Sequence, residues 1–198
     1  METLLSICVG IGLSAACGFR VFVPLFVMSM ASLSGHLALS SGFEWIGTYP
    51  ALTAFGIATC VEIAGYYVPW VDNLLDTIAT PAAIVAGIIV TASVVSDMSP
   101  FLKWALAVIA GGGVAGMVQV ATGVTRGAST VTTAGVGNPL VATMELGGAM
   151  GLSILAIAVP LLAGLVVVGL LCLAARKVFE KQRMREASPT PKEWTKVS

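Results

Sequence analysis

Five long apolar runs occupy most of this 198-residue chain and leave few alternatives for its fold. They cover residues 4–33, 50–69, 79–96, 101–125 and 147–175. A helix needs about 20 apolar residues to cross the hydrocarbon core of a bilayer, and these runs approach or exceed that length. Only 10% of the residues are charged, which is too few to cover a water-exposed surface. The sequence therefore predicts an all-α, polytopic transmembrane helix bundle with about five membrane helices.

The first and last runs contain features that interrupt a straight helix. Residues 4–33 would form a helix of about 45 Å, and Gly18, Arg20 and Pro24 lie near its middle. We expect a break or a bend at that point. The run 147–175 contains Pro160 and is also long enough to tilt or kink. The bundle is thus expected to contain at least one broken or re-entrant element.

Two connecting segments have compositions unlike those of ordinary loops. Residues 69–81 begin and end with proline, and they are expected to form a short amphipathic helix. Residues 126–147 are rich in hydroxyls and glycine and contain Asn138 followed by Pro139. This second segment is predicted to be re-entrant or unwound, which is tolerated at membrane depth only beside a cavity or inside protein.

Charge is distributed unevenly along the chain. Residues 176–198 hold seven of the ten basic residues and directly follow an apolar run. This pattern predicts a transmembrane domain over residues 1–175 and a basic, cytoplasmic, disordered tail after it. With five crossings, the N-terminus would lie outside, Lys103 in the cytoplasm, and Asp72 and Asp76 outside. The assignment reverses if the first or the last run crosses twice.

The chain offers little for metal, cofactor or hydrolytic chemistry. Its four cysteines are scattered through apolar stretches, and His36 is the only histidine. No pair has the spacing of metal ligands, so we predict neither a metal site nor a cofactor. The signatures of hydrolases and of phosphate-binding loops are also missing from the sequence.

Ionisable side chains in the apolar runs need an explanation, because each costs about 2.5–3.5 kcal/mol on insertion scales. Arg20, Glu62 and Arg126 lie in such runs or at their ends, and Glu145 joins them if its segment enters the bilayer. One explanation is structural: the four groups pair and fix how the helices pack. The other is functional: the arginines grip a carboxylate, a phosphate or a lipid head group, while Glu62 balances charge or couples to protons. The candidate substrate-binding residues are Arg20, Glu62, Arg126, Asn138 and Glu145.

An acidic pair lies in the segment that follows the second apolar run. Asp72 and Asp76 are four residues apart and share one helical face, with the Asn73 amide nearby. The two carboxylates could bind a cation or polarise a water molecule at the membrane interface. A solvated acidic surface explains them equally well, and Asp76 is also placed to cap a helix that starts near Thr77. Both interpretations stay open.

Two motifs resemble those of a known family: GFRVFVPLF at residues 18–26 and PWVDNLLDTIATPAA at residues 69–83. From about residue 5 to residue 175, the chain resembles DUF4126, a family of small multipass bacterial membrane proteins of unknown function. The resemblance supports the membrane assignment and implies the cell inner (plasma) membrane as the location. It strengthens the candidacy of Arg20, Glu62, Asp72, Asn73 and Asp76. It implies nothing about the substrate.

The sequence favours a membrane transporter, or a protein that translocates lipids or anions. The expected partners are membrane lipids, a small anionic or lipid substrate and a second copy of the chain. Nucleic acid is not expected, because juxtamembrane charge explains the basic tail. Two alternatives stay open: an accessory or scaffold subunit without transport, and a membrane enzyme that acts on a lipid through Asp72 and Asp76.

Overall fold

The computed structural model describes residues 2–186, without the side chains of residues 69–74, 76, 174–175, 177–179, 181–182 and 184–186. This part of the chain is helical between its turns and contains no strand, so the all-α prediction is confirmed. The elements are α1 (Glu2–Phe19), α2 (Phe22–Leu33), the short 3-10 helix η1 (Glu44–Gly47), α3 (Tyr49–Gly65), α4 (Pro69–Val94), α5 (Pro100–Leu106), the π-helix η2 (Ala107–Gly112), α6 (Gly113–Thr133), α7 (Asn138–Ala158) and α8 (Pro160–Glu186). The chain up to Gly164 forms one compact unit, and a second begins at Leu165.

The distribution of side chains is that of a membrane protein. Four stretches of the described chain are long and apolar enough to cross a bilayer: Glu2–Phe19, Thr77–Val94, Pro100–Thr133 and Asn138–Ala158. Large apolar side chains such as Ile57, Val124 and Ile154 are exposed on the outside. Ionisable side chains such as Arg20 and Glu145 are buried. This pattern suits lipid as the surrounding solvent, because lipid imposes no cost on exposed apolar surface.

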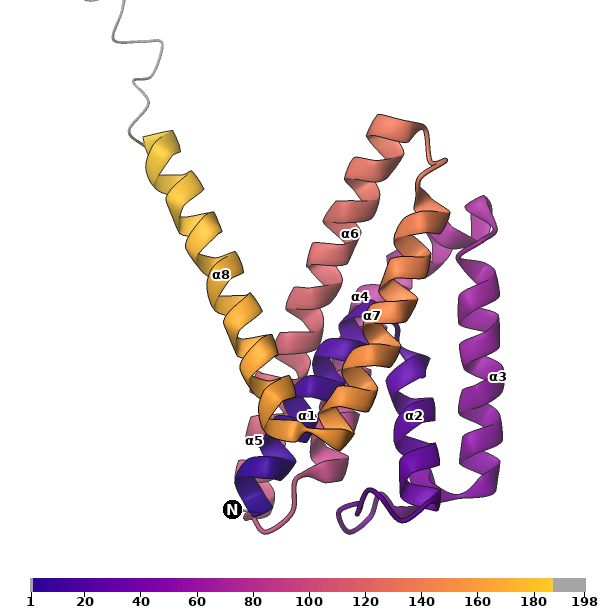
Figure 1. Cartoon of the computed structure of the whole chain (residues 1–198), viewed down its shortest axis with the longest axis vertical. Coiled ribbons are helices and arrows are strands. Elements are labelled where there is room, and N and C mark those ends of the chain that lie inside the picture. Colours follow the sequence, from indigo (N-terminus) through magenta and orange to yellow (C-terminus); the bar gives the residue numbers. More distant parts are fainter. Residues whose placement is uncertain (1, 187–198) are drawn as a thin grey trace, which may run out of the picture. The chain divides into compact units, whose positions relative to one another are not determined.

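The first apolar run folds into a helical hairpin, which confirms the predicted break. The chain leaves the helical path at Arg20 and Val21 and turns back into α2. The Thr91 hydroxyl of α4 donates to the Gly10 carbonyl of α1 at 3.3 Å, and two residues further on Ser93 contacts Met28 of α2. The middles of α1 and α2 therefore lie at the same height (Figure 1). With 12 residues, α2 is about 18 Å long, which is shorter than a 30 Å hydrocarbon core.

The hairpin changes which segments share an end of the bundle. The Ser40 amide donates to the Ser93 carbonyl at 2.7 Å, and the Lys103 ammonium contacts the Ser40 hydroxyl. The start of α1, the 34–48 segment and Lys103 thus lie at one end (Figure 1). The turns at 66–68 and 134–137 lie at the other end, where the Tyr67 hydroxyl meets Thr143 at 2.9 Å. The first run thus returns to the end where it began, which is the alternative, left open above, that reverses the predicted sides.

The two unusual connecting segments are more helical than predicted. Residues 69–81 are the beginning of α4, which continues through Pro81 to Val94 and is not a separate short helix. Residues 126–147 contain only a tight turn around Ala134 and Gly135, both at positive φ, so the prediction of an unwound segment is wrong. The hydroxyls that suggested unwinding bond within their own helix: Thr133 donates to the Ser129 carbonyl one turn earlier at 2.7 Å.

The last apolar run divides at Pro160, as its proline predicted. Its first part completes α7, and α8 begins at Pro160 because proline fits the first turn of a helix. The helix α8 continues to Glu186, so the first part of the predicted basic tail is helical. Residues 187–198 of that tail lie outside the described residues.

Small residues hold α1, α4 and η2 together at close range. We call Gly10, Ser14, Gly87, Thr91 and Gly111 the small-residue seam. The Ser14 hydroxyl donates to the Gly111 carbonyl in the π-helix. A Cβ atom at Gly87 would lie 2.7 Å from the carbonyl oxygen of Gly111, so only glycine permits this approach. The seam fixes the middle of α1 against α4 and η2 and thereby the position of the hairpin tip at Arg20.

Candidate functional site

Arg20 stands at the tip of the α1–α2 hairpin and is almost completely buried. Its amide donates to the Ala16 carbonyl at 3.1 Å and closes the last turn of α1. Gly18 brings this turn against α6, where a Cβ atom would lie 2.6 Å from the Ala115 carbonyl oxygen. The break that follows leaves the Arg20 side chain inside the bundle, where 2% of its surface is exposed.

The Arg20 guanidinium meets a second arginine and a glutamate from the α6–α7 pair. Arg126 Nε donates to both carboxylate oxygens of Glu145, at 3.0 and 3.1 Å, and its Nη2 contacts Oε2. Arg20 Nη2 lies 3.6 Å from Glu145 Oε2 and donates to the Ala142 carbonyl at 2.9 Å. Glu145 therefore bridges two arginines in a buried site, where charge-assisted hydrogen bonds are strong.

Tyr66 supplies an aromatic face to both guanidinium groups. The Cζ atoms of Arg20 and Arg126 lie 3.7 and 3.9 Å from the centroid of its ring. At these distances each cation is attracted by the negative face of the ring. We call Arg20, Tyr66, Arg126 and Glu145 the arginine cluster. Sequence reasoning missed Tyr66, although its spacing of four residues from Glu62 placed it on the same side of α3.

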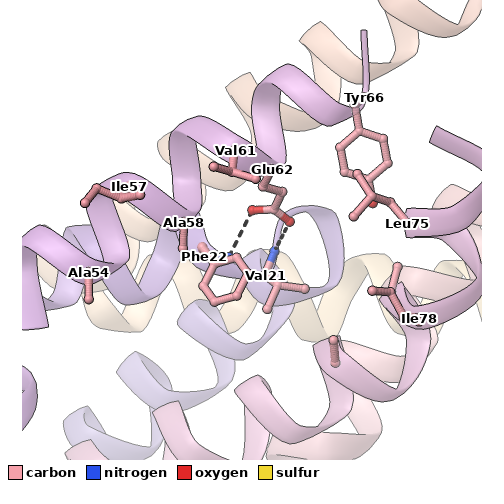
Figure 2. Close-up of a pocket in the computed structure, with 12 residues that line it drawn as sticks. Val21, Phe22, Ala54, Ile57, Ala58, Val61, Glu62, Tyr66, Leu75 and Ile78 are labelled. Atoms are coloured by element: carbon pink, nitrogen blue, oxygen red, sulfur yellow. Dashed lines mark hydrogen bonds between the residues drawn. The ribbon is translucent and has the colours of Figure 1, made fainter. Parts of the chain in front are cut away.

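Glu62 caps the second arm of the hairpin. Its carboxylate accepts the amide of Val21 at 2.8 Å and the amide of Phe22 at 3.1 Å, as the dashed lines in Figure 2 show. A carboxylate at a helix N-terminus satisfies amides that lack a partner within the helix and interacts favourably with the helix dipole. Glu62 of α3 thus stabilises the start of α2, while the ion pair of Arg20 is with Glu145.

Two donors of Arg20 are left without a partner. In the described part of the chain, neither Nε nor Nη1 has a hydrogen-bond acceptor, although both atoms are buried. A buried donor without an acceptor costs about 1–3 kcal/mol, and more when it is charged. The cluster therefore lacks an acceptor for these two donors, and an anion suits a guanidinium best.

An apolar groove begins beside the cluster and runs between α2, α3 and α4. One cavity of about 310 Å³ contains Glu62 and Tyr66 among its lining residues (Figure 2). A second, of about 480 Å³, extends to Trp45 and Ile89. The residues that line both cavities are Val21, Phe22 and Ala82, so we treat the two cavities as one groove.

The structure brings together four of the five predicted substrate-binding residues. Arg20, Arg126 and Glu145 contact one another, and Glu62 lies at the same hairpin tip. Asn138 is elsewhere: its amide donates to the Thr130 hydroxyl at 3.1 Å across the α6–α7 turn. The side chains of the predicted interfacial acidic pair and its amide, Asp72, Asn73 and Asp76, lie outside the described residues. Among the described residues, no three histidine, cysteine, aspartate or glutamate side chains are grouped to hold a metal ion.

Comparisons with known proteins identify a family and no function. No curated protein and no solved structure matches the chain. The domain of unknown function DUF4126 matches residues 7–180, a range that includes every member of the arginine cluster and Glu62. The resemblance predicted from the hairpin motif and the motif at the start of α4 is thereby confirmed. The chain belongs to the DUF4126 family.

Proposed function

We propose that this protein binds an anionic group at the arginine cluster and moves it across the inner membrane, as a transporter or a lipid translocator. The observation that carries the proposal is the pair of buried Arg20 donors, Nε and Nη1, which have no acceptor in the described chain. A phosphate or carboxylate oxygen would supply the missing acceptor. We place the C-terminal basic residues in the cytoplasm, according to the positive-inside rule.

The balance of charge in the cluster supports an anionic ligand. Two guanidinium groups face one carboxylate, that of Glu145, among the described residues. Glu62 lies nearby, but its charge is directed at two backbone amides of α2. An anion next to Arg20 would therefore gain charge-assisted hydrogen bonds.

The α1–α2 hairpin supports transport over simple binding. Transporters commonly place their substrate sites where a membrane helix is interrupted, because the interruption exposes polar groups within the bundle. Here the interruption falls at Arg20, between two helices of one hairpin. A site on such a hairpin can change its access by moving the tip while the rest of the bundle stays in place.

Reconstitution into proteoliposomes tests this proposal. We expect the full chain to take up radiolabelled phosphate or to scramble fluorescent phosphatidylglycerol. Arg20→Lys keeps the charge but replaces the planar guanidinium, and it should reduce the rate about tenfold or more. Arg176→Lys makes the same change at an exposed position of α8 and should leave the rate unchanged. Movement of neither probe, or an Arg20→Lys rate equal to that of the wild type, would refute the proposal.

A second function, that of an accessory or scaffold subunit, is favoured by a different observation. Glu62 caps a helix and Glu145 pairs with Arg126, so three of the four buried charges have a structural role without any ligand. In such a subunit, Arg20 would only fix the packing of the hairpin tip. Co-purification of a stoichiometric protein partner, together with wild-type behaviour of Arg20→Lys, would support this function.

A further inference from the structure

The groove has the length and the lining that an acyl chain requires. Along α4 it extends from Leu75 to Ile89, a distance of about 21 Å at 1.5 Å per residue. One leaflet of a bilayer core is about 15 Å thick, so a single lipid tail fits along it. The lining residues are apolar apart from Glu62, Tyr66 and Trp45.

The groove and the arginine cluster share a side chain. Tyr66 lines the groove, and its ring also contacts the guanidinium groups of Arg20 and Arg126. Figure 2 shows Tyr66 beside Leu75 at the end of the groove away from Ala54. A molecule lying in the groove therefore ends at Tyr66, the side chain that contacts both cations.

The depth of the cluster suits a lipid head group. The continuous α5–η2–α6 stretch of 34 residues is about 51 Å long, which exceeds the 30 Å hydrocarbon core. Arg126 is seven residues before the end of α6, and Glu145 is seven residues after the start of α7. Both positions are about 10 Å inside the ends of their helices. With the stretch centred in the bilayer, this is the boundary between hydrocarbon and head groups.

We infer that this groove binds an anionic phospholipid, with one acyl chain between α3 and α4 and its phosphate at Arg20. The inference rests on the proposed function and specifies its substrate class. Two guanidinium groups against the ring of Tyr66, at the end of the groove, favour an anionic head group. They disfavour a zwitterionic lipid, whose ammonium group would face two like charges. Phosphatidylglycerol is the corresponding probe, and phosphatidylcholine is its zwitterionic counterpart.

Binding to the full chain in detergent, followed by native mass spectrometry, tests the inference with two matched variants. Ala54→Phe fills the groove from an exposed position on α3. Ala64→Phe makes the same change on the same helix, at an exposed position outside the groove. We expect Ala54→Phe to weaken phosphatidylglycerol binding about thirtyfold, as if two or three methylene groups were displaced, and Ala64→Phe to leave it unchanged. Phosphatidylcholine should bind more weakly to the wild type.

A binding measurement with inorganic phosphate distinguishes a failure of this inference from a failure of the proposed function. The inference is overturned if both alanine variants bind phosphatidylglycerol equally well, or if phosphatidylcholine binds as tightly. If phosphate then still binds and Arg20→Lys abolishes that binding, the anion site stands and its ligand is a free anion. If neither phosphate nor phosphatidylglycerol binding depends on Arg20, both proposals fail.

Discussion

The hairpin helix α1 takes part in two buried polar regions that are built in different ways. In the small-residue seam, Ser14 and Thr91 donate to the carbonyls of Gly111 and Gly10, and the backbones approach too closely for any larger residue. In the arginine cluster, at the end of the same hairpin arm, Glu145 pairs with two arginines and Arg20 keeps two donors without an acceptor.

This difference separates a scaffold from a site. The seam satisfies its hydroxyls with backbone carbonyls and leaves no room for another molecule. The cluster carries an unsatisfied cation beside an apolar groove, at a cost in stability that packing alone would not require. A buried polar group without a partner needs an explanation, and a ligand that supplies the acceptor is one. The first two predictions below test whether the two regions behave as scaffold and site, and the third tests the helix cap that Glu62 provides.

The largest effect is expected within the cluster, between its two arginines. Arg126→Met leaves Glu145 without its principal partner and should lower the free energy of unfolding by about 3–5 kcal/mol. Arg20→Met removes one hydrogen bond, a longer contact with Glu145 and the contact with Tyr66, together with two unsatisfied donors. Because Arg126 still pairs with Glu145, a smaller loss of about 1–2 kcal/mol is expected. Unfolding of the purified protein in a mixed-micelle denaturant titration measures both. Equal losses would mean that Arg20 is as structural as Arg126.

A smaller loss is expected in the seam. Gly87→Leu places a side chain against the Gly111 carbonyl, and the resulting displacement of η2 should cost about 1–3 kcal/mol. Gly123→Leu is the matched control, because a Cβ atom there would meet nothing within 4 Å. Thermal melting of the two variants in the same detergent compares them. An unchanged melting temperature for Gly87→Leu would show that the seam is not tightly packed.

The smallest of the three effects concerns the helix cap. Glu62→Gln keeps the shape of the side chain but leaves one of the Val21 and Phe22 amides without an oxygen acceptor, at a cost of about 1–2 kcal/mol. Hydrogen exchange at the start of α2 should accelerate correspondingly. Glu44→Gln is the control, because Glu44 accepts the Gly42 amide at an exposed position. Equal exchange in wild type and Glu62→Gln would rule out the capping role.

The sequence predicts the site better than it predicts how the site is held. The cost of a charge in an apolar run is independent of the fold, so Arg20, Glu62, Arg126 and Glu145 could be identified directly. The break at Arg20 was also predictable, because Gly18 and Pro24 flank it. The helical character of residues 126–147 was missed, because hydroxyls that bond within a helix leave the same composition as an unwound chain.

Other features depend on contacts that only the folded chain creates. The partners of Glu62 are backbone amides, which carry no signature in the sequence until the hairpin turns them toward α3. Tyr66 has an ordinary alternative role as an interfacial aromatic residue, so its contact with two arginines could not be inferred. The direction of α2 decides which segments share an end of the bundle. The length of a hydrophobic run does not show whether the chain turns back within it.

The most direct test of the central claim is to observe what meets Arg20 in a lipid environment. A cryo-EM map of the full chain in phosphatidylglycerol nanodiscs would resolve the hairpin tip and the groove. We expect non-protein density within hydrogen-bond distance of Arg20 Nε or Nη1, continuous with density along the groove. Both nitrogens bonded to protein groups, with a groove empty of any head group, would contradict the claim that Arg20 is held ready for a ligand.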